Sequence, residues 1–381
     1  MIYLDNAATT KPYLKCSWIL VKDMLFNWFN ASSLYKKGEK QQNRIKKYKR
    51  IISKKLACNS NEIYFTSGAT ESNNWVIKGL VLRYLKEHKL DKNFMLPHII
   101  TTNIEHHSIT NCIKQLVDLG MCQVTYINPE KNGMVLNQNV IREIKPNTIL
   151  VSMIATNNET GMPNFIKELH KELKKYNILL HTDATQAIGK QEILGNYADF
   201  ITMSGHKIHA PKGIGLMIGN AFLLEPLIIG GQQQNFQRAG TENVGLIECL
   251  AYSISKISKT DGLNISSLKW YATEKLQELF DRDEYIINGD NILSPILSIS
   301  FKGVEGEYLT SNLSKKGIYL STGSACNTGD LNPSEVLQAM NVPKNYIGGT
   351  IRLSFTNKTE FEDIRRCLIE VRRLIPKDGE E

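Results

Sequence analysis

The stretch Phe200-Ile201-Thr202-Met203-Ser204-Gly205-His206-Lys207 places a mostly apolar run directly before a small polar turn that ends in a lysine. Such a run is typical of a strand that is buried on both faces of a mostly parallel sheet. Comparable runs predict more strands, and amphipathic stretches between them predict helices. The expected strands are 63–66, 98–102, 123–126, 148–153, 178–182, 199–203 and 215–218, and the expected helices are 71–90, 107–119, 137–144 and 164–176. This alternation predicts an α/β fold with a large, mostly parallel sheet covered by helices on both sides.

The pattern changes after about residue 245. A long helical stretch is followed by expected strands at 285–287, 296–301, 318–321 and 350–354, and by a final helix from Thr359. Helices and strands without regular alternation are typical of an α+β arrangement. We therefore predict a large domain at 13–245 and a smaller α+β C-terminal domain at 246–381, with residues 1–12 packing near the smaller one.

Composition narrows the class of protein. The chain has 381 residues, 42% of them hydrophobic, which is enough for a large core. No apolar run approaches the roughly 20 residues that span a bilayer, and the N-terminus lacks the pattern of a signal peptide. The seven cysteines are scattered without a Cys-x-x-Cys pair. This spacing argues against disulfides and a metal site, and it favours a reducing, cytoplasmic location.

The positive charge of the chain is concentrated in one segment. Residues 36–55 contain ten basic side chains and one acid, Glu39. A solvated helix face is the ordinary interpretation of such a run. A docking surface for tRNA or for an acidic partner protein is the alternative, although the sequence contains no RNA-binding motif.

A lysine and an aspartate follow two of the expected strands. Lys207 lies beside small, hydrogen-bonding residues, where a lysine can form a Schiff base. Asp183 closes the apolar run 178–180, where a carboxylate could pair with the protonated pyridine nitrogen of pyridoxal phosphate (PLP). The alternatives are a surface lysine and a helix N-cap aspartate.

Two other segments carry groups suited to a phosphorylated aromatic cofactor. Residues 66–74 follow a strand and open a helix, so the amides and hydroxyls after Gly68 could hold a phosphate. His106 follows the strand at 98–102, where an imidazole could lie against a cofactor ring and move protons. A well-capped helix start and a structural pair of histidines, His106 and His107, are the alternatives.

The C-terminal part contributes a cysteine and an arginine. Cys326 lies in the small-residue loop 321–329, a setting that suits a solvent-reachable thiolate. Cys249, by contrast, lies in an apolar run and fits a structural role. Arg352 lies inside the short strand 350–354, where a substrate carboxylate or an internal salt bridge would be its partner.

Together these segments resemble the cysteine desulfurases, the NifS/IscS-like branch of the fold-type I, class V PLP enzymes. The resemblance covers nearly the whole chain. It is carried, in the family's order, by 3–10, 67–73, 157–159, 183–186, 204–207, 238–243, 323–326 and 351–354. Each motif alone is weak, whereas their joint order and spacing are highly specific.

The resemblance implies a role for each matched residue. Lys207 would carry PLP as a Schiff base, Asp183 would pair with the pyridine nitrogen, and Gln186 would bond the ring hydroxyl. Thr241 would reach the phosphate of a neighbouring subunit, which implies a homodimer. The cofactor-binding set would comprise Ala69, Thr70, His106, Asn157, Asp183, Gln186, Ser204, His206, Lys207 and Thr241. The phosphate contacts among them would come from Ala69, Thr70, Ser204 and His206, besides Thr241 of the neighbouring subunit.

The implied reaction removes sulfur from L-cysteine, gives L-alanine and leaves a persulfide on Cys326. Lys207, Cys326 and His106 would be the catalytic residues, with Asn157 and Arg352 on the substrate carboxylate. The sulfur would pass to an acceptor protein, either a tRNA-thiolation enzyme or an iron–sulfur scaffold, and the short C-terminus favours the former. The alternatives are a selenocysteine lyase or aminotransferase of class V, and a non-catalytic sulfur-relay or tRNA-binding module.

Overall fold

A seven-stranded sheet forms the centre of the computed structural model, which describes residues 1–191, 194–289, 294–323 and 334–375, with only the backbone at 259–263. Neighbouring strands are parallel except at β8, which runs antiparallel to both its neighbours. The sheet is therefore mostly parallel, as predicted. Its order is β2 (Ile63–Thr66), β8 (Gly215–Gly219), β7 (Phe200–Ser204), β6 (Leu179–Asp183), β5 (Thr148–Ser152), β3 (His98–Thr102) and β4 (Gln123–Ile127).

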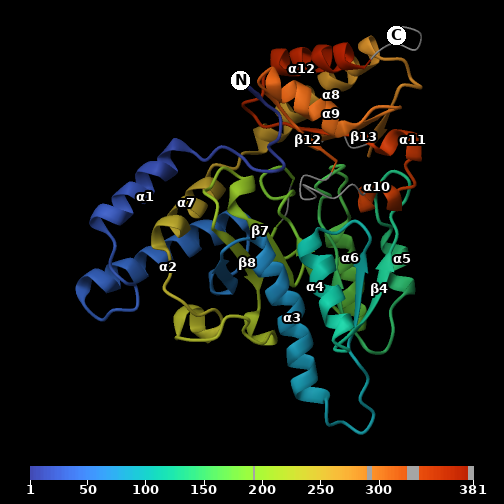
Figure 1. Ribbon diagram of the computed structural model, residues 1–381. Helices are drawn as coiled ribbons and strands as arrows, with labels where there is room; N and C mark the ends of the chain where they lie inside the picture. The colour runs from blue at the N-terminus through green and yellow to red at the C-terminus, as the bar shows by residue number, and fades with distance from the viewer. Residues whose placement is uncertain (192–193, 290–293, 324–333, 376–381) are drawn as a thin grey trace.

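Helices cover both faces of this sheet (Figure 1). Successive strand residues point to opposite faces, so Phe200 packs in one core and Ile201 in the other. One face meets α3 (Ala69–His88) and α4 (His107–Asp118). The other meets α2 (Lys36–Leu56), α5 (Asn137–Arg142), α6 (Ile166–Leu173) and α7 (Val244–Ser255). Burial on both faces explains why the strands are apolar throughout.

A second, antiparallel sheet carries the C-terminal part of the chain. Its order is β12 (Ser321–Thr322), β13 (Gly349–Ser354), β10 (Ile296–Phe301) and β9 (Tyr285–Asn288). Helices α8 (Lys259–Leu279), α9 (Gly306–Lys315) and α12 (Phe361–Leu374) share one apolar core with it. This unit lies above the large sheet in Figure 1, and α10 (Glu335–Ala339) and α11 (Lys344–Ile347) lie beside it.

Several boundaries differ from the predicted ones. The strand expected at 318–321 is two strands: β11 (Ile318–Tyr319) pairs with β1 (Ile2–Tyr3), whereas β12 pairs with β13. The last helix begins at Phe361 instead of Thr359, because Glu360 and Asp363 form a capping box there. The domain division stays a prediction, although residue 245 falls inside α7, whose apolar residues belong to the core of the large sheet.

The N-terminal segment joins the two sheets. Asp5 forms a bridge with Ser354 of β13, and the Ala7 amide donates to the Ser354 hydroxyl at 2.8 Å. A few residues later, the Thr10 amide donates to the carbonyl of His206, just beyond β7. Residues 5–10 therefore tie the end of β7 to the C-terminal sheet. No helix in the described ranges is both long enough and apolar enough to cross a membrane.

Candidate active site

A cavity of about 530 Å³ opens where the parallel strands end, the usual position for a ligand in such a sheet. Strand β6 delivers Asp183 to it, β7 delivers Ser204, and the turn that follows delivers His206 and Lys207. Other predicted residues that line the same cavity are Ala69, Thr70, His106, Gln186 and Arg352. Residues spread over about 280 positions of sequence therefore meet at one site.

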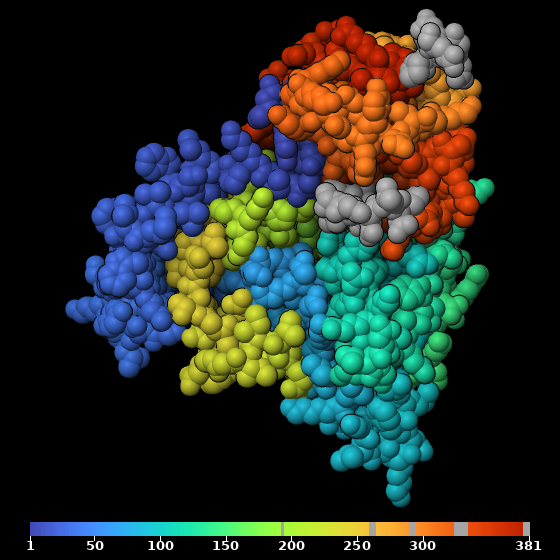
Figure 2. All heavy atoms as spheres, in the orientation of Figure 1, coloured from blue at the N-terminus to red at the C-terminus, as the bar shows by residue number. Residues whose placement is uncertain are grey.

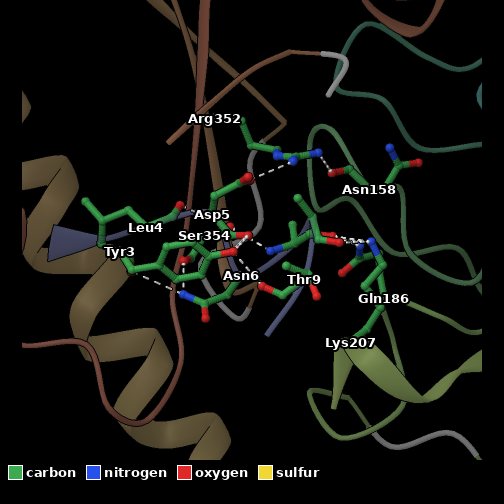
Figure 3. Close-up of polar contacts among 12 residues, drawn as sticks. Tyr3, Leu4, Asp5, Asn6, Thr9, Asn158, Gln186, Lys207, Arg352 and Ser354 are labelled. Atoms are coloured by element: carbon green, nitrogen blue, oxygen red, sulfur yellow. Dashed lines mark hydrogen bonds and ion pairs between the residues drawn. The ribbon is translucent and has the colours of Figure 1, made fainter. Parts of the chain in front are cut away.

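The amine of Lys207 is held by the N-terminal segment (Figure 3). Its Nζ donates to the carbonyl of Ala7 at 2.6 Å and to that of Ala8 at 2.7 Å. Thr10 fixes the turn that carries Lys207, because its hydroxyl donates to the His206 carbonyl and accepts from the His209 amide. The side chain is therefore positioned at the cavity wall by backbone carbonyls.

Asp183 is oriented by a residue that the sequence analysis did not select. The Asn73 amide donates to Asp183 Oδ2 at 2.8 Å, and the Thr185 backbone amide donates to Oδ1 at 2.9 Å. Asn73 is fully buried, and it also receives a hydrogen bond from Thr202. The quoted motif 66–74 contained Asn73, but only folding could show that it faces an aspartate 110 positions away.

The same network reaches His106. Asn73 Nδ2 donates to Ser108 Oγ at 2.8 Å, and Ser108 Oγ lies 2.8 Å from His106 Nδ1. The Ser108 backbone amide also donates to Nδ1 at 3.1 Å, so Nδ1 is an acceptor and the ring proton belongs on Nε2. Burial lowers the pKa of His106, and the positive charge of Lys207 adds to this effect while Asp183 opposes it. The imidazole is therefore neutral at pH 7.

The start of α3 also lies at the cavity. In the described chain no side chain caps this helix at its N-cap, Gly68, and Gly68, Ala69 and Thr70 all line the cavity. A Cβ on Gly215 would lie 2.6 Å from Gly68 Cα, so only glycine allows β8 to pass this close. Burial and nearby lysines lower the pKa of His206 to about 4, so its ring is neutral.

Arg352 forms the internal salt bridge that was one of its two predicted roles, and it also lies at the cavity. It lines the cavity from β13, and its side chain is 2% exposed. Its Nη2 pairs with Asp5 Oδ1 at 3.1 Å, and its Nη1 donates to the Asn158 carbonyl at 2.9 Å (Figure 3). The buried Nε lacks a hydrogen-bond partner in the described structure. The internal salt bridge is present, and it holds the guanidinium at the cavity wall.

Two buried carboxyl groups of the cavity wall were not predicted. Burial raises the pKa of Glu105 to about 8 and that of Glu159 to about 7. Glu105 Oε1 accepts from Thr102 and from the Ile154 amide, whereas Glu159 accepts from the Ser334 hydroxyl. At neutral pH Glu105 is therefore mostly protonated and Glu159 about half protonated, which reduces the negative charge at the cavity wall.

The remaining predicted residues have different positions. Asn157 does not line the cavity, because its side chain donates to the Ile104 carbonyl and accepts from the backbone of Glu159 and Thr160. The next residue, Asn158, lines it instead. Thr241 is exposed and does not line this cavity. Cys326 lies outside the described residues.

The other six cysteines are all free and buried or half-buried. Burial raises the pKa of Cys58 and Cys122 to about 11 and that of Cys112 and Cys367 to about 12. Cys16 and Cys249 are fully buried between α1 (Leu14–Phe26) and α7. Within the described ranges, no cluster of His, Cys, Asp and Glu is arranged to hold a metal ion.

Comparisons with known proteins identify the family of this chain. The family model described as aminotransferase class-V matches residues 2–367. The cysteine desulfurase IscS of Methanosarcina thermophila is 36% identical over 99% of this chain and 92% of its own, and the cysteine desulfurase of Nostoc sp. is 35% identical over 97% and 91%. A solved NifS-like protein has a TM-score of 0.88 at 28% identity over 98% of both chains. SspA, solved in complex with cysteine, has a TM-score of 0.82 at 31% identity over 94% of this chain and all of its own. The chain belongs to the class-V aminotransferase family and, within it, to the cysteine desulfurases.

Proposed function

We propose that this protein uses PLP to take sulfur from L-cysteine and to hold it as a persulfide on Cys326. The observation that carries the proposal is the convergence of Lys207, Asp183 and His106 on one cavity. An amine, a buried carboxylate and a neutral imidazole are the groups that PLP chemistry on an amino acid requires. An aminotransferase would share this set, whereas the full-length relatives are named cysteine desulfurases.

The cavity fits PLP in size and in chemistry. Its volume of about 530 Å³ lies within the usual range for a cofactor site. Lys207 would bind the aldehyde carbon, and Asp183, kept in place by Asn73, would bind the pyridine nitrogen. The uncapped start of α3 with Thr70, Ser204 and His206 would hold the phosphate. When bound, PLP supplies an electron sink for the bonds at the α-carbon of the substrate.

Arg352 and Asn158 are the groups best placed for the substrate carboxylate. Both line the cavity, and the guanidinium is already held by Asp5 and by the Asn158 carbonyl. Asn157, which the resemblance suggested, would support this wall through its bonds to Ile104 and Glu159. His106 would move protons near the substrate through Nε2, because Nδ1 is engaged by Ser108.

Cys326 is proposed as the nucleophile on its sequence context and on the state of the other thiols. Its thiolate would attack the sulfur of L-cysteine, so that an S–S bond forms while the Cβ–S bond breaks. The released electron pair stays with the three-carbon product, which takes up a proton to become alanine. Cys58, Cys112, Cys122 and Cys367 are poor candidates, because burial disfavours their thiolates.

A homodimer is part of this proposal. Helix α1 exposes an apolar stripe at i, i+4, i+7 and i+11, formed by Leu14, Trp18, Val21 and Leu25. Leu14 is 76% exposed and Trp18 is 66% exposed. Helix α1 and the start of α2 project from the body of the molecule (Figure 2). An exposed apolar stripe is typical of a protein–protein contact. A second copy that covers it could bring Thr241 to the phosphate of its neighbour.

The acceptor is proposed to be a protein of tRNA thiolation or of iron–sulfur cluster assembly. Helix α2 offers an exposed basic stripe, Lys36, Lys40, Lys47, Arg50 and Lys54, opposite its buried face. A solvated face is the ordinary interpretation of this stripe, and a surface for an acidic acceptor or for tRNA is the alternative. Capture of the partner that takes sulfur from cysteine-loaded enzyme would identify the acceptor.

Replacement of Cys326 by alanine tests the reaction. We expect the variant to bind PLP normally and to lose sulfide production from L-cysteine. Cys58→Ala is the matched control, because Cys58 is half-buried and does not line the cavity, and it should keep full activity. An aminotransferase would retain turnover in both variants. Selenide release from selenocysteine without release from cysteine would favour a lyase, and a wild-type protein that binds no PLP would favour a relay module.

A further inference from the structure

Lys190 lies behind the cavity wall, and neither the motifs nor the proposed reaction gave it a role. It is not among the residues that line the larger cavity, but it lines a second, small cavity of about 50 Å³ together with Lys207. Its Nζ donates to Gln186 Oε1 at 2.6 Å. Lys190 therefore contacts Gln186, a residue of the larger cavity, from the side that faces away from that cavity.

The contact with Lys190 removes an ambiguity in the Gln186 side chain. An amide can point either way in a site, because its oxygen and nitrogen have nearly the same shape. Here Oε1 faces Lys190, and Nε2 donates to the Ala7 carbonyl at 2.9 Å. The charged Lys190 amine can only donate and the Ala7 carbonyl can only accept, so the two partners together favour this orientation of the amide.

The fixed amide belongs to the group of contacts that holds Lys207. The Ala7 carbonyl accepts both from Gln186 Nε2 and from Lys207 Nζ, the latter at 2.6 Å (Figure 3). Gln186 and Lys207 are therefore linked through one carbonyl oxygen, and Lys190 is linked to them through Gln186. In this series of hydrogen bonds, the NH₂ group of Gln186 bonds the carbonyl that also holds Lys207, and the Gln186 oxygen bonds Lys190.

We propose that Lys190 is a positioning residue, which keeps the NH₂ group of Gln186 available to the ring hydroxyl of PLP. The inference rests on the proposed function, because the hydroxyl belongs to that cofactor. An ionised ring hydroxyl needs a donor, and a flipped amide would present an acceptor to it. Lys190 would act only through Gln186. Burial and the nearby charges of Lys207 and Arg352 lower the pKa of Lys190 to about 7, and both its charged and neutral forms can donate to Oε1.

Binding of PLP to the apoprotein tests this role with four proteins. Lys190→Met keeps the length of the side chain and removes the donor, whereas Lys190→Arg keeps a donor. Lys256→Met is the matched control, because Lys256 is exposed, lines the same small cavity and is not among the partners of Gln186 in the described structure. Each protein is titrated with PLP and with the PLP analogue that lacks the ring hydroxyl.

We expect Lys190→Met to bind PLP about tenfold more weakly than wild type, the effect of one lost hydrogen bond of this kind, and to bind the analogue with unchanged affinity. Lys190→Arg should weaken PLP binding by less than Lys190→Met does, and Lys256→Met should bind PLP as tightly as wild type. Equal affinity of wild type and Lys190→Met for PLP would overturn the inference and leave the proposed function intact. Equal weakening for both ligands would assign Lys190 a general structural role and overturn it as well. A wild-type protein that binds no PLP would overturn both.

Discussion

Removal of the Asn73 amide is the sharpest test of the hydrogen-bond network in the site. Asn73 is fully buried, donates to Asp183 and Ser108 at 2.8 Å each, and accepts from Thr202. Asn73→Ala leaves a buried carboxylate oxygen and two hydroxyls without this partner. The adjacent Asn74 lies on the same helix and is only half-buried, and it donates to the carbonyls of Thr70 and Ser108. Asn74→Ala is therefore the matched control.

The expected cost follows from the contacts. A hydrogen bond to a charged group contributes about 1.5 to 3 kcal/mol and a neutral one about 1 kcal/mol. Asn73→Ala loses one bond to a carboxylate and two to hydroxyls, so it should lower the free energy of unfolding by about 3.5 to 5 kcal/mol. Asn74→Ala loses two bonds to backbone carbonyls, one of them exposed, and should lower it by about 1 to 2 kcal/mol. Without the amide, Asp183 can also turn away from the cavity, so the affinity for PLP should fall as well.

Urea denaturation of the two apoproteins, followed by tryptophan fluorescence, measures the first effect, and titration with PLP measures the second. The reasoning fails if Asn73→Ala and Asn74→Ala lose the same stability and bind PLP equally well. It also fails if Asn73→Ala unfolds like wild type, because the amide would then contribute nothing to the buried carboxylate.

Four more expectations follow from the site and the surface. Lys207→Ala should abolish the visible absorption band of bound PLP and the activity, and a variant that keeps the band would refute the assignment of Lys207. Arg352→Lys keeps the charge and loses the planar fork, so the KM for L-cysteine should rise about tenfold with a smaller change in kcat; an unchanged KM in steady-state assays would contradict carboxylate binding. Glu105 has a raised pKa of about 8 in the fold and an ordinary value of 4.5 when unfolded, so its burial costs stability increasingly as pH rises from 4.5 to 8. Glu105→Gln should remove that cost, so its stability relative to wild type should improve by roughly 3 to 5 kcal/mol between pH 5 and 9, and parallel stability–pH curves would refute this. Trp18→Asp should shift the protein to monomers in sedimentation velocity, whereas an unchanged dimer would show that α1 is not the contact.

The sequence predicted the sheet well, because its strands are buried on both faces and are therefore apolar throughout. The predicted strands at 63–66 and 98–102 match β2 and β3 residue for residue. The split of 318–321 could not be predicted, because β11 finds its partner in β1, more than 300 residues away. Short strands are decided by such distant pairings and not by local pattern.

The candidate site likewise contains residues that the sequence predicted and residues that it could not predict. Lys207, Asp183 and His106 were selected because each follows a strand, and parallel strands end at one edge of a sheet. Asn73, Glu105, Glu159 and Lys190 were not selected, because their significance lies in a partner or in burial. Asn158 instead of Asn157 faces the cavity because the Asn157 side chain closes its own loop.

The sequence by itself determined the family and the class of fold, and it predicted the reactive groups, because motif order and apolar runs are local properties of the chain. Tertiary structure alone decided which side chain faces which. The salt bridge of Arg352 with Asp5, the two carbonyls that hold Lys207 and the orientation of the Gln186 amide all arise where the N-terminal segment crosses between the two sheets. Hydrogen bonds depend on distance and direction in space, and no local pattern of residues specifies either across about 180 to 350 positions.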